Sequence, residues 1–394
     1  MNREHIEANS ATVGDGVVIG ANSLIRADRV VLRDDVRIGD NVEIHCDTLE
    51  LGPGCKIGAG SRIVCPGVVV EEGCTIAPGF RAELNQSLEL GRHSIVGPGG
   101  SMTGQGVRLG QFVFLDEGLS VGGGGARGPR AFLTVGDRTS IFARSFINLS
   151  ERVEIGKNVG ISFNVAFLTH NAWQPVLKGY TAQFAPISVQ DNATIYFNVV
   201  VLPGVTIGEW STIGAGSVVR RDVPARCLAA GNPAQVVRGP QGYPRPLDDT
   251  ERDELIRSIL ADYLTGLDLK GVRLIEDRMA CAGYAIVEFE GRLTTISHLA
   301  ITLPQPTLTS RPDITLSEGP SPDGIVGGCH FDLEGESLSG ETNGLAEDLR
   351  DYLRRRGIRV FTDRPFRSLP LANLQRLMQR SAPSTTGGLT HVEH

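Results

Sequence analysis

Among the residues able to do chemistry, His170 has the most distinctive position, because it stands where a long loop interrupts a regular aliphatic pattern. A neutral imidazole, whose reference pKa is about 6.5, can accept a proton near neutral pH, so this side chain could act as a general base. The chain has eight histidines, and only His170 stands at the start of this loop. A histidine at a loop corner can equally be structural, and the residue alone leaves both roles open.

The loop that follows, residues 169–186, carries three aromatic side chains, those of Trp173, Tyr180 and Phe184. They could screen a reacting group from water, or they could pack against a neighbouring subunit. The sequence does not choose between these roles.

A second insertion, residues 122–130, contains four consecutive glycines in the sequence GGGGARGPR. Such a run could cradle an anion, but no P-loop pattern and no helix signal follow it. We therefore expect a mobile surface loop.

Both insertions interrupt a repeat of six residues, which must build the framework that positions them. From residue 189 onward, aliphatic residues recur without a miss at Val189, Ile195, Val201, Ile207, Ile213 and Val219. This period is neither that of a helix nor the alternation of a flat strand, and it predicts a three-sided parallel β-helix with one hexapeptide per side. The ten predicted coil starts are Val13, Leu32, Leu51, Val70, Leu90, Leu109, Val135, Ile155, Val189 and Ile207.

Small residues recur four positions into the hexapeptides, where we expect inward-facing corners with little room. They are Ser23, Cys55, Ser61, Cys74, Ser94, Ser145, Ala193, Ser211 and Ser217. The chain has seven cysteines, an odd number, and no C-x-x-C pair. We interpret them as small stacked residues rather than as a disulfide framework or a zinc site.

The composition argues against several classes of function. A net charge of −7 and a pI of about 5.7 do not favour a broad nucleic-acid-binding face. The N-terminal sequence has no apolar signal region, and no stretch is long enough to span a membrane. We therefore expect a cytoplasmic protein that neither binds nucleic acid nor inserts into a membrane.

The sequence predicts a second domain after the repeats. We place the β-helix at residues 1–240, a linker at 241–246, an α+β domain at 247–380 and a disordered tail at 381–394. The α+β domain has helical patterns at 248–267 and 345–357, strand patterns at 284–296 and 324–335, and a further strand, IRVFT, at 358–362. No motif in it identifies a chemistry, and His330 and Asp332, which share a strand face, are interpreted as structural.

From Ile155 to Ala234 the chain resembles the hexapeptide-repeat acyltransferases, which include galactoside and maltose O-acetyltransferases and xenobiotic acetyltransferases. The resemblance is carried by the segment VVVLPGVTIGEWSTIGAGSVVRRDVPARCLAAGNPAQVV and by the loop AFLTHNAWQPVLKGYTAQFAPISV. It implies a left-handed parallel β-helix, a homotrimer with active sites between neighbouring prisms, and acetyl-CoA or another acyl-CoA as donor. Across the first 150 residues it covers the fold alone, and it does not reach the C-terminal domain.

The same resemblance implies roles for individual residues. His170 would be the general base, and no metal would take part. Asn171, Trp173, Tyr180 and Phe184 would contact the acceptor. The donor would contact Gly214, Ala215, Gly216, Arg220, Arg221, Ala230, Gly231 and Arg238.

The chain departs from the sugar-specific pattern in three places, which concern the acceptor more than the reaction. Gln190 replaces the usual Gly, TIYFN stands at 194–198 in place of a Trp–Ile–Gly run, and IFARSFIN at 141–148 replaces an Asn-rich stretch. We therefore expect an acyl-CoA-dependent O- or N-acyltransferase. Its acceptor would be a hydroxyl or amine of a sugar, a glycan precursor or a secondary metabolite.

Two alternatives come from other classes of protein. A zinc hydratase on the same fold would need three histidines to converge, and His45 and His93 lie far along the repeats from His170. The other alternative is a non-catalytic trimeric scaffold that presents the C-terminal domain for binding.

Overall fold

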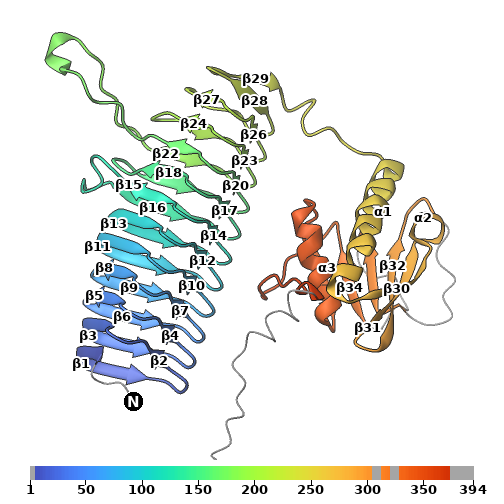
Figure 1. Ribbon diagram of the computed structural model, residues 1–394. Helices are drawn as coiled ribbons and strands as arrows, with labels where there is room; N and C mark the ends of the chain where they lie inside the picture. The colour runs from blue at the N-terminus through green and yellow to red at the C-terminus, as the bar shows by residue number, and fades with distance from the viewer. Residues whose placement is uncertain (1–4, 304–311, 320–327, 373–394) are drawn as a thin grey trace, which may run out of the picture. The chain divides into compact units, whose positions relative to one another are not determined.

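The computed structural model describes residues 5–303, 312–319 and 328–372 (Figure 1). Contacts divide the chain between Arg245 and Pro246 into two compact units. The first is a parallel β-solenoid and the second a smaller sheet with helices, so the predicted fold class, a mainly β chain with a smaller α+β domain, is confirmed. The tail predicted at 381–394 lies outside the described residues.

The solenoid has three sides, which we call the first, second and third face in chain order from each coil start. The second face is a sheet of short strands, one per coil, joined to their neighbours in parallel. Its strands are β2 (Val18–Ile19), β4 (Arg37–Ile38), β7 (Lys56–Ile57), β10 (Thr75–Ile76), β12 (Ile95–Val96), β14 (Phe114–Leu115), β17 (Ser140–Ile141), β20 (Gly160–Ile161), β23 (Thr194–Ile195), β26 (Thr212–Ile213) and β28 (Leu228–Gly231).

The third and first faces together form one 17-stranded sheet, because four long strands bend round the corner that joins them. These four are β1 (Ile6–Val13), β3 (Leu24–Leu32), β11 (Arg81–Leu90) and β13 (Ser101–Leu109). The other strands of the third face are β5 (Glu43–His45), β8 (Arg62–Val64), β15 (Ser120–Gly122), β18 (Phe146–Asn148), β21 (Ala166–Phe167), β24 (Val200–Val201) and β27 (Val218–Val219). Those of the first face are β6 (Thr48–Leu51), β9 (Gly67–Val70), β16 (Phe132–Val135), β19 (Val153–Ile155), β22 (Ile187–Val189) and β25 (Thr206–Ile207).

The ten predicted coil starts stack on one another in register. Val13 pairs with Leu32, Leu32 with Leu51, and the series continues unbroken to Val189 and Ile207. The match arises because one inward aliphatic residue per face must recur in every coil to fill the core. All of the predicted small corner residues are buried, and serines among them donate to coil carbonyls, as Ser94 does to Gly110.

The last coil closes with a hairpin. Strand β29 (Ala234–Arg238) runs antiparallel to β28 and completes the sheet of the second face. Without it, the backbone groups of β28 would form an open parallel edge, which invites unwanted strand pairing.

The C-terminal unit is a six-stranded sheet in the order β30-β31-β32-β33-β34-β35, packed against two helices through a core of its own. The central pairs β32–β33 and β33–β34 are parallel, and the outer pairs are antiparallel. The strands are β30 (Arg273–Asp277), β31 (Tyr284–Phe289), β32 (Arg292–Leu299), β33 (Ile314–Ser317), β34 (Cys329–Asp332) and β35 (Ser337–Gly340). The helices are α1 (Asp249–Gly266), α2 (Met279–Ala282), α3 (Gly344–Arg355), and the 3-10 turns η2 (Val176–Lys178) of the solenoid loop and η3 (Asp268–Lys270).

One predicted strand of this unit is wrong. The segment IRVFT, residues 358–362, makes a single bridge between Phe361 and Ser337 instead of a strand. Its apolar pattern reflects burial of Val360 in the core rather than pairing along the sheet.

Candidate functional site

The two insertions meet at one edge of the solenoid. One follows β15 and the other follows β21, so both project from the solenoid at the corner between the third and first faces. The short corner after β18 lies between them, since Gly122 pairs with Asn148 and Ile147 with Phe167. Three successive corners therefore contribute side chains to one place.

The His170 ring is held at its Nδ1 atom. This nitrogen lies 2.8 Å from Oδ1 of Asn148 and 2.9 Å from Oγ of Ser150. The side chain is partly buried, whereas Thr169 before it is fully buried and donates from Oγ1 to Oδ1 of Asn148 at 2.7 Å. The ring is thus fixed on one side by the coil below.

This network assigns the proton of the neutral ring. The Asn148 amide nitrogen donates to the carbonyls of Gly122 and Gly124, both at 3.2 Å, so its oxygen must be the atom that faces His170. The Ser150 hydroxyl donates to the Gly124 carbonyl at 2.5 Å, which leaves its oxygen to accept. Nδ1 therefore carries the hydrogen, and Nε2 keeps a free lone pair able to accept a proton.

The glycine-rich insertion is anchored to this network rather than free at the surface, contrary to the expectation of a mobile loop. The carbonyls of Gly122 and Gly124 accept hydrogen bonds from Asn148 and Ser150, respectively. Ala126, in the middle of the insertion, is only 1% exposed. At its end, Arg130 forms two hydrogen bonds of 2.5 Å with the carboxylate of Glu151. Glu151 is 5% exposed and directly follows Ser150 in the central corner.

The ion pair between Arg130 and Glu151, which we call the clamp, has an electrostatic consequence. The hydrogen bonds from the Arg130 guanidinium hold the pKa of the Glu151 carboxyl below its ordinary value. Glu151 is therefore ionised at neutral pH, and a bidentate guanidinium–carboxylate pair fixes both position and orientation.

Phe184 and Asn171, both predicted acceptor residues, lie beside His170. The Phe184 ring stacks on the imidazole with centroids 5.4 Å apart and planes 11° apart, and the two residues form a backbone bridge. The Asn171 side chain accepts from the backbone N–H of Gln183 at 2.8 Å, which closes the base of the long loop.

The other two predicted acceptor residues, Trp173 and Tyr180, lie farther out. Figure 1 shows the segment between β21 and β22 as an arm that extends away from the solenoid. Trp173 is 96% exposed and Tyr180 50% exposed, and Leu177 at the 3-10 turn is 99% exposed. The arm thus carries a set of apolar side chains with little cover within the chain.

Five of the predicted donor residues gather at the far edge of the third face, at the corner before β27. Gly214 lies against Ala230, since a Cβ on Gly214 would stand 2.9 Å from the Ala230 Cβ. Ala215 and Gly231 are exposed, and a Cβ on Gly216 would meet nothing within 4 Å. This corner presents bare backbone to solvent.

The three predicted arginines lie elsewhere. Arg220 and Arg221 follow β27 on the same edge as His170, and both are exposed. The pairings place β27 two coils above β21, a rise of about 10 Å. Arg238 is exposed on β29, opposite Leu228. The predicted donor residues are thus divided between the two edges of the third face and the end hairpin.

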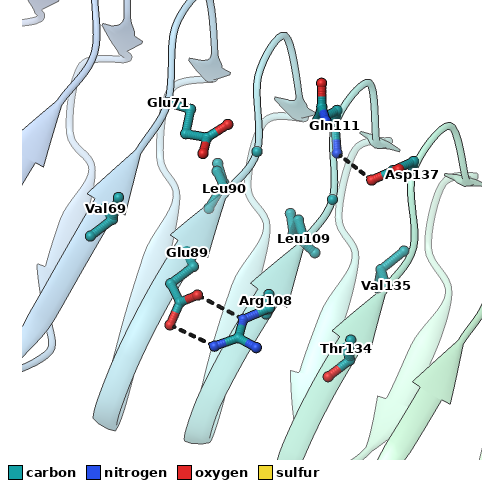
Figure 2. Close-up of a pocket in the computed structure, with 12 residues that line it drawn as sticks. Val69, Glu71, Glu89, Leu90, Arg108, Leu109, Gln111, Thr134, Val135 and Asp137 are labelled. Carbon is teal, nitrogen blue, oxygen red and sulfur yellow. Dashed lines mark hydrogen bonds and ion pairs between the residues drawn. The ribbon is translucent and has the colours of Figure 1, made fainter.

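Two hollows on the solenoid surface do not include His170. One of about 360 Å³ lies where the first face turns into the second, over β9 to β16 (Figure 2). A second, of about 500 Å³, continues from Thr134 along later coils. Their carboxylates serve coil-to-coil contacts, as Figure 2 shows for Glu89 with Arg108 and for Asp137 with the backbone of Gln111.

Sequence reasoning missed Asn148 and Ser150 and the clamp between Arg130 and Glu151. A usable signal existed for Ser150, because it stands 20 positions before His170, and the coil step from Val135 to Ile155 is also 20. No comparable signal existed for the clamp, since the length of an insertion does not say where its residues turn back.

The described residues form no metal site and no membrane-spanning helix. Within residues 5–303, 312–319 and 328–372, no group of three or more His, Cys, Asp or Glu side chains is arranged to hold a metal ion. Within the same residues, no helix has the length and apolar character needed to cross a membrane.

Comparisons with known proteins identify the repeat. The family model of the bacterial transferase hexapeptide (six repeats) matches residues 186–221. The model of the hexapeptide repeat of succinyl-transferase matches residues 10–46 and 49–80. The matches thus fall on both ends of the solenoid.

Among curated relatives, the chain is similar to the galactoside O-acetyltransferase of Escherichia coli, with 42% identity over 88 residues, covering 22% of this chain and 43% of the relative. A Staphylococcus aureus protein described as a candidate acetyltransferase is 47% identical over 130 residues, covering 27% of this chain and 65% of its own length. The chain therefore spans less than two thirds of each of these relatives.

Among solved structures, the chain is similar to a hexapeptide-repeat-containing acetyltransferase of Vibrio cholerae in complex with acetyl coenzyme A. Identity is 27%, coverage 38% of this chain and 70% of that chain, and the TM-score 0.29, which is too low to support more than the likeness itself. The family models and the curated relatives confirm the resemblance predicted from the sequence: residues 10–46, 49–80 and 186–221 of the solenoid match the hexapeptide repeats of transferases.

Proposed function

We propose that the protein is an acyltransferase that moves an acyl group, acetyl in the simplest case, from acyl-CoA to a hydroxyl or amine. The acceptor class is a sugar, a glycan precursor or a secondary metabolite, and His170 is the general base. The observation that carries the proposal is the Nδ1 network, which leaves Nε2 free at a solenoid corner. The similarity to named acetyltransferases supports the reaction class.

The chemistry follows from the tautomer. As the acceptor oxygen or nitrogen attacks the thioester carbonyl, its proton passes to Nε2 of His170. The resulting imidazolium is stabilised through Nδ1–H by the oxygens of Asn148 and Ser150. The tetrahedral intermediate then breaks its C–S bond, and the departing thiolate takes the proton from Nε2, giving the acylated acceptor and free CoA. A positioned base typically contributes about 10²–10⁴-fold to such a reaction.

The donor would lie along the last coils. The bare backbone at Gly214, Ala215 and Gly216 gives a narrow pantetheine chain close access to the coil. Exposed guanidinium groups of Arg220 and Arg221 suit the phosphates of CoA. No metal ion is needed for this mechanism.

We further propose that the working form is a homotrimer. Outward positions of the third face are charged and ion-paired in the early coils, as Arg62 is with Glu43 and Glu83. In the late coils the same face turns apolar, and these residues are half-buried: Ala166, Leu168, Val200, Leu202 and Val218. A strip of this kind, beside an arm with exposed aromatic residues, suits contact with another solenoid.

The proposal places the reaction in the cytoplasm. All seven cysteines are free thiols, including the stacked pair Cys55 and Cys74, and Cys281 is exposed. Free thiols persist in a reducing compartment.

The test is acyl-CoA-dependent transfer by the purified chain, followed by release of the CoA thiol with a panel of sugars and amines. His170→Asn should lower turnover by about 10²–10⁴-fold, while His93→Asn, the same change at another solenoid corner, should leave it unchanged. Full turnover by His170→Asn would end the proposed mechanism.

The non-catalytic scaffold remains the second candidate, because the C-terminal unit has a fold and a core of its own. A thermal-shift measurement with CoA separates the two. A ligand that binds only the folded state raises the unfolding temperature. CoA should therefore raise the unfolding temperature if the protein is an acyltransferase and leave it unchanged if the protein is a scaffold.

A further inference from the structure

The four consecutive glycines of the insertion do not have the same reason to be glycine. Gly122, Gly123 and Gly125 have φ values of 133°, 84° and 82°, which side-chain-bearing residues rarely adopt. A Cβ on each would also stand 3.0, 3.1 and 2.4 Å from atoms of Thr103, Phe146 and Ser150, respectively. These three positions need glycine for the fold of the loop.

Gly124 is different, because neither its backbone nor its packing requires glycine. It is not among the residues with positive φ. Among the residues that the structure describes, a Cβ built on it would meet only Cε1 and Nε2 of His170, each at 3.8 Å, which is ordinary van der Waals contact. An alanine would fit there without strain, and its methyl group would lie against the edge of the ring that carries the free lone pair.

From this geometry we propose that Gly124 is a specificity-determining residue that keeps open the space in which the acceptor meets Nε2 of His170. The missing side chain leaves room for about one methyl-sized group, which is also the size of a hydroxyl or amine. Phe184, whose ring is stacked on the imidazole with centroids 5.4 Å apart, covers one face of the ring. The site thus selects an unhindered hydroxyl or amine, one whose carbon bears no bulky branch. This inference rests on the proposed function of His170 as a base.

The surrounding bonds keep the gap constant. Asn148 and Ser150 hold the Gly124 carbonyl at 3.2 and 2.5 Å, and the same two side chains hold Nδ1 of His170. The loop and the ring are therefore fixed to common partners. Because Gly124 and the His170 ring are held by the same two side chains, the fold itself sets the width of the gap between them. The width does not depend on a moving lid.

The experiment compares Gly124→Ala with Gly160→Ala in the full chain. Gly160 is a matched control, because its φ is also outside the left-handed region and a Cβ there would meet only Thr194, at 4.0 Å, on the second face. Both variants should unfold at the temperature of the parent chain. The probe is diethyl pyrocarbonate, which carbethoxylates unprotonated imidazole nitrogens, with the rate at His170 read by peptide mass spectrometry.

Carbethoxylation of His170 should slow several-fold in Gly124→Ala and stay at the parent rate in Gly160→Ala. Transfer from acetyl-CoA should fall by about tenfold or more in Gly124→Ala, with the KM for acetyl-CoA unchanged. An unchanged carbethoxylation rate in a folded Gly124→Ala protein would overturn the inference. If His170→Asn kept full turnover, the proposed function would fail, yet the carbethoxylation comparison would still decide whether Gly124 controls access.

A second measurement needs no variant, in case Gly124→Ala does not fold. In the parent chain, His170 should react with diethyl pyrocarbonate but much more slowly with the bulky reagent 4-bromophenacyl bromide. The half-buried corner histidine His93 provides the reference for each reagent. Equal discrimination by His170 and His93 would contradict a narrow gap.

Discussion

The chemistry of His170 depends on which ring nitrogen carries the hydrogen, and its neighbours decide this. Asn148 cannot turn its amide without losing its bonds to the carbonyls of Gly122 and Gly124, so its oxygen stays toward Nδ1. The fixed tautomer presents the lone pair of Nε2 to an incoming proton donor.

Ser150→Ala tests this arrangement at the level of one hydroxyl. The variant keeps Asn148 but loses one acceptor for Nδ1–H and the bond to the Gly124 carbonyl. We expect kcat to fall by about tenfold, with the KM for acyl-CoA unchanged. Stability should drop by about 1 kcal/mol, measured by urea unfolding.

Ser120→Ala is the matched control, since Ser120 lies on the adjoining third face and its hydroxyl is hydrogen-bonded to that of Ser101, at 3.4 Å. Equal kcat values in Ser150→Ala and Ser120→Ala would show that Ser150 only packs beside the ring.

The sequence singled out His170 but not the side chains that hold its ring, and the reason lies in the coil geometry. His170 was conspicuous because a loop starts there. Ser150 could have been found by stepping back one 20-residue coil, the step from Val135 to Ile155. Gly124 could not, because its role depends on how an insertion folds back, and no period in the sequence records that.

At the scale of elements, the repeat was predictable because every coil packs its side chains into the same core in the same way. Ten coil starts stack in register since every coil must supply one aliphatic residue per face to a shared core. The corners obey no such rule. The insertion at 122–130 has the glycines of a mobile loop, yet Arg130 and Glu151 bind it to the central corner.

The clamp predicts a pH dependence of the glycine-rich loop. The pKa of Glu151 is lowered in the folded chain by its hydrogen bonds from Arg130. The stabilisation that the ionised carboxylate gives to the folded loop is therefore fully present above the unfolded pKa of about 4.3, and it is lost as pH falls through the folded pKa. Hydrogen exchange, corrected for intrinsic rates, should therefore show the amides of Ala126 and Gly128, which donate to carbonyls within the loop, protected at neutral pH and losing protection in acid.

Glu151→Gln provides the control for that experiment, because an amide cannot titrate in this range. Its loop protection should be weaker than the parent's at neutral pH and should not change through the acid transition. A parent loop whose exchange is the same as that of Glu151→Gln at every pH would show that the clamp does not hold it.

At the scale of the molecule, the third face changes character along the solenoid. Its early coils carry ion pairs such as Arg26 with Glu7, and its late coils carry half-buried aliphatic residues such as Val200 and Leu202. The sequence contains this change in plain view, but only the stacked register shows that the aliphatic residues form one continuous strip.

Val200→Glu tests the proposed trimer. A carboxylate in the strip would have to be desolvated on assembly, so the variant should elute as a monomer by size exclusion with light scattering. Thr194→Glu, the same insertion of charge on the second face of the same coil, should remain a trimer. A Val200→Glu protein with the mass of three chains would place the subunit contact elsewhere.

The central claim, a His170 ring with its hydrogen on Nδ1 and a free Nε2, is tested most directly by ¹⁵N NMR of the imidazole at a pH where the ring is neutral. The Nδ1–H network with Asn148 and Ser150 predicts a protonated-type shift for Nδ1 and an unprotonated-type shift for Nε2. His170→Asn identifies the signals by their loss. The opposite pattern, with the hydrogen on Nε2, would contradict the account, because that ring could not take a proton from an acceptor at the open edge.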